Sequence, residues 1–154
     1  MKTKILMVCL GNICRSPLAE GILWNKVSPN SAFVDSAGTA GYHIGNHPDP
    51  RSIAVAKKYG IDISTQRCRK FTKDDFINFD VIYAMDNSNY NNIISLTSNE
   101  NDIAKVKLLL SETDLSISEV PDPYYGGDKG FEDVFSMIEI ACNNISEKIE
   151  TNTF

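Results

Sequence analysis

Metal-ligating residues are scarce in this chain of 154 residues, which contains two histidines and four cysteines. The histidines, His43 and His47, are isolated from Cys9 and Cys14, and these two cysteines lack the two-residue spacing of a zinc site. A chain of this length can also form a hydrophobic core without a disulfide framework. We therefore expect no metal site, and we expect the cysteines to be free thiols.

Long apolar runs and an excess of positive charge are missing as well. The apolar stretch at residues 5–10 is too short for a secretory signal, and no segment is long enough to span a membrane. With 20 acidic and 15 basic residues, the net charge is −5, which argues against nucleic acid or an anionic membrane as a partner. We expect a cytoplasmic monomer with a single domain over residues 1–150, followed by a frayed end at 151–154.

Apolar segments alternate with helical patterns along the chain. Strands are expected at residues 4–10, 31–38, 80–85 and 104–110, and helices at 17–28, 50–60, 86–97 and 131–149. The alternation predicts an α/β fold, namely a single doubly wound domain with a four-stranded parallel sheet flanked by helices. Ligands bind such sheets beyond the carboxyl ends of the strands, so the loop after the first strand is a favoured place for a site.

The segment "VCLGNICRSP", residues 8–17, forms that loop. Cys9 and Arg15 are separated by five residues, and the helical pattern follows at once. Ser16 is expected to cap the helix, with Pro17 at its first position. A short loop before a helix N-terminus directs backbone N–H groups and the helix dipole toward an anion. The spacing therefore predicts an anion-binding loop.

The side chains of this loop suit a phosphoryl group and a nucleophile. Gly11 and Asn12 allow the loop to curl, and the Arg15 guanidinium can bind two phosphoryl oxygens. An anion-binding loop also favours the thiolate form of Cys9, to which the Ser16 hydroxyl could donate. A cysteine at a strand end is by itself most often a small buried apolar residue. The complete set favours a cysteine nucleophile beneath a bound phosphoryl group.

A second segment, "PDPYYGG", offers a proton donor for the leaving oxygen. Asp122 lies between Pro121 and Pro123, which stiffen the backbone that must direct its carboxyl group. Tyr124 and Tyr125 follow and could form the wall of a cleft. This segment is also typical of an ordinary turn. Only the presence of the loop at residues 8–17 favours a catalytic role for Asp122.

Asp49 and Cys14 lie in or near these segments, and their own spacing does not indicate a catalytic role. Asp49 precedes Pro50 and is expected to cap the helix that begins there. For Cys14 two interpretations remain open. It could simply be packed in the core, or it could form a disulfide with Cys9 on oxidation.

Together these segments resemble the low-molecular-weight protein tyrosine phosphatase family over nearly the whole chain. The segments that carry the resemblance are "VCLGNICRSPLAE", "VDSAGT", "FDVIYAMDNSN" and "PDPYYGG". The resemblance implies that Cys9 forms a phosphocysteine and that Arg15 binds the phosphate. It also implies that Asp122 protonates the leaving phenolate and then deprotonates the attacking water.

The resemblance further implies how substrate is bound. The substrate-binding residues would be Leu10, Gly11, Asn12, Ile13, Cys14, Ser16, Tyr42, Tyr124 and Tyr125. Ser36 would join Asn12 and Ser16 in holding the shape of the loop. No cofactor is implied, and the implied ligands are phosphotyrosine-containing proteins and, in the loop, phosphate or similar oxyanions.

Two positions refine the resemblance. A relative that hydrolyses phosphoarginine has threonine where this chain has Ile13, so Ile13 favours phosphotyrosine as the substrate. Many members have a histidine that supports the asparagine of the loop. This chain has Gln66 at that place, which could still form a hydrogen bond.

Three other functions fit the sequence less well. A thiol-dependent arsenate reductase shares the loop but needs further cysteines, and residues 69–141 contain none. A non-catalytic phosphotyrosine-binding module would lack the nucleophile, the arginine or the acid, and all three are present. A phosphate-transferring cysteine domain of a sugar transport system is disfavoured by Asp122 and the two tyrosines that follow it.

Overall fold

The computed structural model describes residues 2–124 and 126–154, and in these ranges four parallel strands form one sheet in the order β2-β1-β3-β4. The strands are β1 (Thr3–Cys9), β2 (Ala32–Gly38), β3 (Val81–Ala84) and β4 (Val106–Leu108). The helices are α1 (Arg15–Trp24), α2 (Pro50–Lys58), α3 (Asp74–Asn78), α4 (Asn87–Ile94), α5 (Glu100–Ala104) and α6 (Gly127–Glu150), and a 3-10 helix covers Leu109–Glu112. The predicted doubly wound α/β domain is confirmed.

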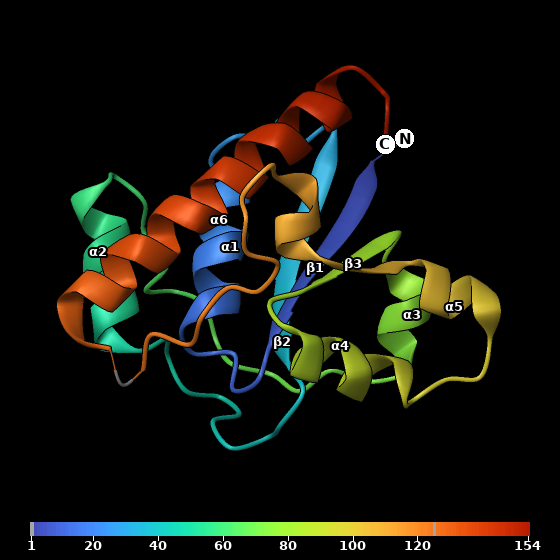
Figure 1. The fold of residues 1–154 in the computed structure, drawn as a ribbon, viewed down its shortest axis with the longest axis horizontal. Coiled ribbons are helices and arrows are strands. Elements are labelled where there is room, and N and C mark those ends of the chain that lie inside the picture. Colours follow the sequence, from blue (N-terminus) through green and yellow to red (C-terminus); the bar gives the residue numbers. More distant parts are fainter. Residues whose placement is uncertain (1, 125) are drawn as a thin grey trace.

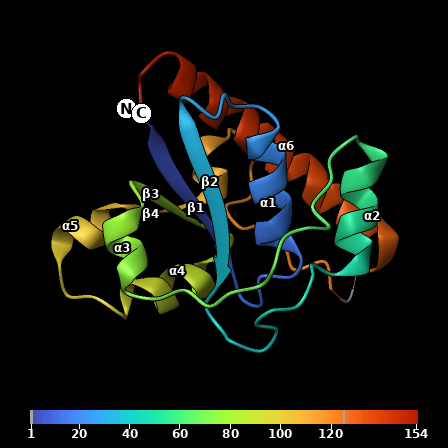
Figure 2. The ribbon, with the colours of Figure 1, turned by 180° about the vertical axis from the view of Figure 1, so that it is seen from behind.

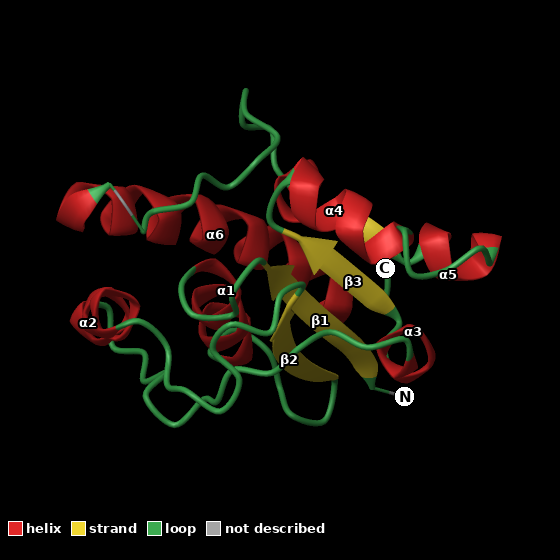
Figure 3. Ribbon diagram, turned by 90° about the horizontal axis from the view of Figure 1, so that it is seen from below, coloured by secondary structure: helices red, strands yellow, loops and turns green. Residues whose placement is uncertain are grey.

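Helices cover both faces of the sheet (Figures 1 and 3), and each face packs an apolar cluster of its own. Alternate side chains of β1 point to opposite faces, so Ile5 and Met7 pack with α1 and α6, whereas Leu6 and Val8 pack with α3 and α4. α2 lies against α1 and α6 on the first side. This covering of both faces explains why the strands read as continuous apolar runs.

The first helix begins earlier than predicted, and the prediction that Ser16 caps it is wrong. α1 begins at Arg15 with Cys14 at the cap position, so Ser16 and Pro17 are its second and third residues. Proline is tolerated there because the N–H groups of the first helical turn have no intrahelical acceptor. The Ser16 hydroxyl is therefore available for other contacts.

Three other helix ends are well defined, and the predicted cap at Asp49 is confirmed. Asp49 caps α2, since its carboxylate accepts a hydrogen bond from the Arg51 N–H at 2.8 Å. Gly60 follows the same helix with a φ of 81°, the left-handed conformation that ends helices. Asp86 caps α4 by accepting from the Asn89 N–H at 2.8 Å.

The start of β1 and the last residue of the chain border one pocket, because Thr3 and Phe154 both line it. In Figures 1 and 2 the start of β1 lies at the opposite end of this strand from the loop that follows it. The Phe154 ring lies 5.9 Å from the Lys107 ammonium and 6.0 Å from that of Lys148. No helix within the described ranges is both long enough and apolar enough to cross a membrane.

Candidate active site

The loop between β1 and α1 is held from outside by its carbonyl groups. The Cys9, Leu10 and Ile13 oxygens accept hydrogen bonds from the N–H groups of Thr39, Ala40 and Asp49, at 2.9, 2.9 and 2.8 Å. Asn12 makes the turn with a φ of 58°, whereas Gly11 does not use a left-handed conformation. Gly38 lets the loop approach β2, because a Cβ there would lie 2.7 Å from the Leu10 oxygen.

The N–H groups of the same loop remain available to a ligand. Among the described residues, none provides an acceptor for the N–H groups of residues 10–15. These groups lead into the N-terminus of α1, which carries partial positive charge. The loop can therefore bind an anion such as a phosphoryl group.

Cys9 lies at the base of this loop with its sulfur beside Ser16. The Cys9 Sγ is 3.0 Å from the Ser16 Oγ, and Ser16 accepts a hydrogen bond from the Asn12 side-chain amide at 2.8 Å. Both Cys9 and Ser16 are buried. A hydroxyl that accepts from Asn12 has its own hydrogen free for the sulfur, so Ser16 can stabilise a thiolate on Cys9.

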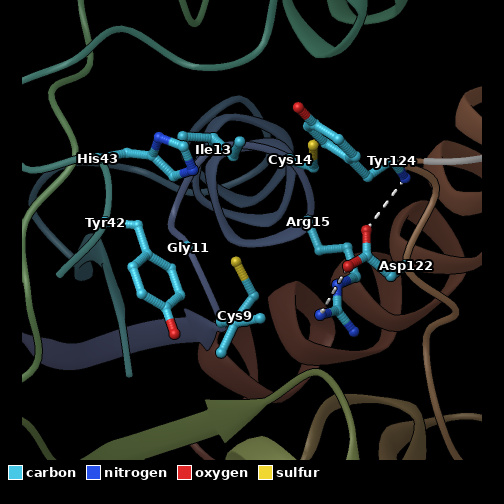
Figure 4. A pocket seen from close by; sticks show the side chains of 10 residues that line it. Cys9, Gly11, Ile13, Cys14, Arg15, Tyr42, His43, Asp122 and Tyr124 are labelled. Carbon is cyan, nitrogen blue, oxygen red and sulfur yellow. Dashed lines mark hydrogen bonds and ion pairs between the residues drawn. The ribbon is translucent and has the colours of Figure 1, made fainter. Parts of the chain in front are cut away.

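Arg15 is buried and held in one orientation by two acceptors. Its Nη1 donates to the Asp86 carboxylate at 2.7 Å and to the Val120 carbonyl at 2.9 Å. Its Nη2 lies 3.9 Å from the Asp122 carboxylate (Figure 4). Asp86 lies two residues after the end of β3, at the carboxyl edge of the sheet. The preference of ligands for this edge, which favoured the Cys9 loop, could have identified Asp86 too.

Asp122 lies at the opening of the pocket with about half of its side chain exposed. Its Oδ1 accepts from the Tyr124 N–H at 3.0 Å, which leaves the Oδ2 to face Arg15 (Figure 4). Sequence reasoning missed Arg51, which donates to the Tyr124 carbonyl at 2.8 Å and binds Asp49 through Nε and Nη2. Arg51 thus joins the Asp122 loop to the start of α2.

These groups surround one pocket of about 320 Å³. Its lining comprises Cys9, Leu10, Gly11, Ile13, Cys14, Arg15, Tyr42, His43, Asp122 and Tyr124. Figure 4 shows the Tyr42 and Tyr124 rings on opposite sides, with the Cys9 sulfur between them. His43, which packs on Gly11 at the rim, was not among the predicted residues. Tyr125 lies outside the described residues.

The remaining predicted residues lie behind the loop and are not part of the pocket lining. The Asn12 amide donates to Ser16 at 2.8 Å and to Ser36 at 3.0 Å, and its oxygen accepts from the Arg69 N–H at 3.0 Å. Asn12, Ser16 and Ser36 are all buried. These side chains can fix the shape of the loop, and none of them lines the pocket.

Gln66 does not take the place of a histidine beside Asn12. Its Nε2 donates to the Pro17 carbonyl at 3.1 Å, and its buried Oε1 has no hydrogen-bond partner among the described residues. The support predicted from Gln66 comes instead from the Arg69 main chain and from the Cys68 thiol, which donates to the Asn12 carbonyl at 2.8 Å. The described residues contain no cluster of side chains that could hold a metal ion.

We expect iodoacetate to alkylate Cys9 before the other three cysteines at mildly acidic pH. Burial raises the pKa of Cys68 to about 11 and that of Cys14 to about 12, where Asp49 and Cys9 add to the effect, and burial also raises the pKa of Cys142. These three thiols therefore stay protonated and unreactive. Peptide mass mapping over time measures the order, and inorganic phosphate should protect Cys9. Equal rates for Cys9 and Cys68 would contradict the anion-binding role of the loop.

Comparisons with known proteins agree with this geometry. The family model described as low molecular weight phosphotyrosine protein phosphatase matches residues 4–153. The human low molecular weight phosphotyrosine protein phosphatase is 41% identical, over 94% of each chain. A protein tyrosine phosphatase structure from Entamoeba histolytica is 39% identical, with a TM-score of 0.91 over 99% of this chain and 100% of that one.

A further structural relative carries a bound ligand. Vibrio vulnificus Wzb, solved in complex with benzylphosphonate, is 28% identical, with a TM-score of 0.85 over 96% of this chain and 99% of that one. The family match covers almost the whole chain, and the relatives agree with it in length, sequence and fold. This chain therefore belongs to the low molecular weight phosphotyrosine protein phosphatases, a family of protein-tyrosine-phosphatase enzymes.

Proposed function

We propose that this protein hydrolyses phosphotyrosine in proteins through a phosphocysteine intermediate on Cys9. The observation that carries the proposal is the convergence of three groups on one pocket. The Cys9 sulfur lies at its base, the Arg15 guanidinium is fixed beside it, and the Asp122 carboxylate lies at its opening, 3.9 Å from Arg15 (Figure 4). A nucleophile, an anion-binding group and an acid are the three groups that this reaction needs.

In the first step, the phosphoryl oxygens bind the N–H groups of residues 10–15 and the Arg15 guanidinium. The Cys9 thiolate attacks phosphorus, a P–S bond forms, and the bond from phosphorus to the phenolic oxygen breaks. Protonated Asp122 gives its proton to that oxygen, so tyrosine leaves as a neutral phenol. Charge that develops on the phosphoryl oxygens is stabilised by groups already in place.

In the second step, water replaces the sulfur. Ionised Asp122 takes a proton from a water molecule as its oxygen attacks phosphorus, and the P–S bond breaks. The sulfur leaves as a thiolate, which the Ser16 hydroxyl 3.0 Å away stabilises. Phosphate leaves the loop, and Asp122 is again protonated for the next cycle.

The walls of the pocket favour an aryl phosphate over a shorter alkyl phosphate. The sulfur is buried at the floor, while the exposed Tyr42 and Tyr124 rings stand at the sides. An aromatic ring can contact these walls and still place its phosphoryl group at the floor. The apolar Ile13 also lines the pocket, which suits a phenyl ring better than a guanidinium.

The test uses three versions of one peptide, bearing phosphotyrosine, phosphoserine or phosphoarginine. We expect phosphate release from the phosphotyrosine peptide to be faster by at least about 100-fold in kcat/KM. Acid quenching during turnover should also give a Cys9-containing peptide with one added phosphoryl group, read by mass spectrometry. Comparable release from the phosphoserine peptide, or faster release from the phosphoarginine peptide, would overturn the substrate assignment.

We also propose that the protein acts in the cytoplasm and as a monomer. Its nucleophile must be a free thiolate, which a reducing compartment preserves. Cys9, Cys14, Cys68 and Cys142 are all free and buried. Phosphate, as product, and similar oxyanions are expected to bind in the loop and compete with substrate.

A further inference from the structure

A chain of hydrogen bonds connects Glu20, outside the pocket, with the sulfur of Cys9. Glu20 lies on α1 and accepts a hydrogen bond from the Ser36 hydroxyl at 2.6 Å. Ser36 in turn accepts from the Asn12 amide at 3.0 Å, and the same amide donates to Ser16 at 2.8 Å. Ser16 lies 3.0 Å from the sulfur. The mechanism described above does not use Glu20.

The charge of Glu20 fixes the direction of the Ser36 hydroxyl, and the Arg69 N–H fixes that of the Asn12 amide. An ionised carboxylate can only accept, so the Ser36 hydroxyl must give its hydrogen to Glu20 and use a lone pair for Asn12. The Asn12 amide then has one hydrogen on Ser36 and one on Ser16, while its oxygen accepts from the Arg69 N–H. The Ser16 oxygen thereby accepts one hydrogen bond from Asn12, and its hydrogen is left for another acceptor.

The hydrogen of Ser16 has two acceptors within reach. One is the Cys9 sulfur at 3.0 Å, and the other is the Ala37 carbonyl at a longer 3.4 Å. With Asn12 held in its orientation, the Ser16 hydroxyl is directed toward the sulfur. If Ser36 turns and the Asn12 amide loses this acceptor, Asn12 is held less firmly, and Ser16 can turn its hydrogen to Ala37 and leave the thiolate with one donor fewer.

We propose that Glu20 is a positioning residue for the nucleophile, and that its ionised form orients Ser36, Asn12 and Ser16 so that Ser16 donates to Cys9. The proposal rests on the proposed function in one respect, namely that Cys9 is the nucleophile. Glu20 itself touches neither substrate nor sulfur. Its effect reaches the reaction only through the three side chains between them.

The surroundings place the ionisation of Glu20 near neutral pH. Burial raises the pKa of Glu20 to about 7, with a further contribution from the Asp35 carboxylate on β2. The Ser36 hydrogen bond and the positive charge of Arg69 act in the opposite direction. Arg69 is shared, because its guanidinium also binds the carboxylates of Asp35 and Asp75. Donation by Ser16 should therefore weaken as the pH falls below neutral.

The variant Glu20→Gln reproduces the uncharged state at every pH. We expect the ratio of wild-type to variant kcat/KM for p-nitrophenyl phosphate to be near 1 at about pH 5.5 and to rise to about 5- to 10-fold at about pH 8, with its midpoint near pH 7. The ratio cancels the ionisation of the substrate. Alkylation of Cys9 by iodoacetate should show the same pH-dependent ratio, because it also reports on the thiolate.

At high pH, Glu20→Gln should raise the stability of the fold, although it lowers the activity there. Between the ordinary glutamate pKa of 4.5 and about 7, the folded chain holds a proton that the unfolded chain has released, so this group lowers stability as the pH rises. Glu20→Gln should therefore have a Tm close to wild type at about pH 5 and above it at about pH 8. The matched control is Glu112→Gln, which removes a buried carboxylate bound to Lys148 and Tyr83. That control should lower the Tm and leave the activity ratio flat.

Ser36→Ala interrupts the series of hydrogen bonds from Glu20 to Cys9 without changing Glu20 itself. It should reproduce the loss at about pH 8, and adding Glu20→Gln to it should cause no further loss. The positioning role is overturned by a ratio that does not vary with pH, or by a Glu20→Gln effect that persists in full in the Ser36→Ala background. If Glu20→Gln does not fold, Ser36→Ala alone gives the decisive pH profile. The alkylation rates test the role of Glu20 even if phosphate release does not depend on Cys9. A failure of the positioning role can therefore be told apart from a failure of the proposed function.

Discussion

Replacing Cys9 by serine is expected to lower turnover of p-nitrophenyl phosphate by at least about 10⁴-fold. A serine hydroxyl does not ionise near neutral pH, so neither the attack on phosphorus nor the departure of the nucleophile can proceed at its normal rate. The Ser16 Oγ lies 3.0 Å from the Cys9 sulfur, and a hydrogen bond from Ser16 cannot make an anion of a serine hydroxyl. Phosphate release measures the loss, and no phosphorylated peptide should form.

The same variant should still bind substrate. The N–H groups of residues 10–15 and the Arg15 guanidinium do not depend on the sulfur, so the affinity for a phosphotyrosine peptide should remain within a few-fold of wild type. Calorimetry measures this affinity. The matched control is Cys142→Ala, which removes a buried thiol of α6 outside the pocket and should retain turnover. Full activity in Cys9→Ser would refute the assignment of the nucleophile.

The position of the site could be predicted because it follows from topology. The loop after β1 lies at the carboxyl edge of a parallel sheet, where N–H groups and a helix N-terminus meet. Cys9, Arg15 and Asp122 were all chosen from sequence, and the structure brings them to one pocket. Asp122 could be chosen only after the loop was recognised, because its own segment is also typical of an ordinary turn.

The hydrogen bonds behind the loop could not be predicted from spacing. Ser16 was expected to cap the helix, since a serine before a proline is typical of a cap, yet α1 begins two residues earlier than expected and the hydroxyl lies beside Cys9. Glu20 looks like an ordinary helical surface residue in the sequence. Its partner Ser36 comes from β2, sixteen residues away, so only the folded chain joins the two.

Element types were easier to predict than element ends. The fourth strand was expected at 104–110, but it covers only Val106–Leu108 because the chain turns into a 3-10 helix at Leu109. α3 and α5 were not predicted at all. Each has five residues rich in polar side chains, which is too short for an apolar periodicity to be visible.

Replacing Asp122 by asparagine should slow substrates to different extents, according to how readily their leaving group departs without a proton. Without a proton donor, we expect kcat/KM for a phosphotyrosine peptide to fall by about 10²- to 10⁴-fold. The loss for p-nitrophenyl phosphate should be much smaller, because p-nitrophenolate leaves readily without a proton. Arg15 and the loop amides still hold the phosphoryl group, so the affinity for either substrate should change little. Steady-state kinetics with both substrates measures the difference.

The same variant should also show that Asp122 acts as a base in the second step, the hydrolysis of the phosphocysteine. With p-nitrophenyl phosphate, Asp122→Asn should release a burst of p-nitrophenolate equal to the enzyme concentration and then turn over slowly, because no base activates the water that attacks the phosphocysteine. The matched control is Asp128→Asn, which neutralises an exposed carboxylate in the first turn of α6 and should show neither effect. A uniform loss with both substrates and no burst would show that Asp122 only shapes the pocket. In that case another group would have to move the proton.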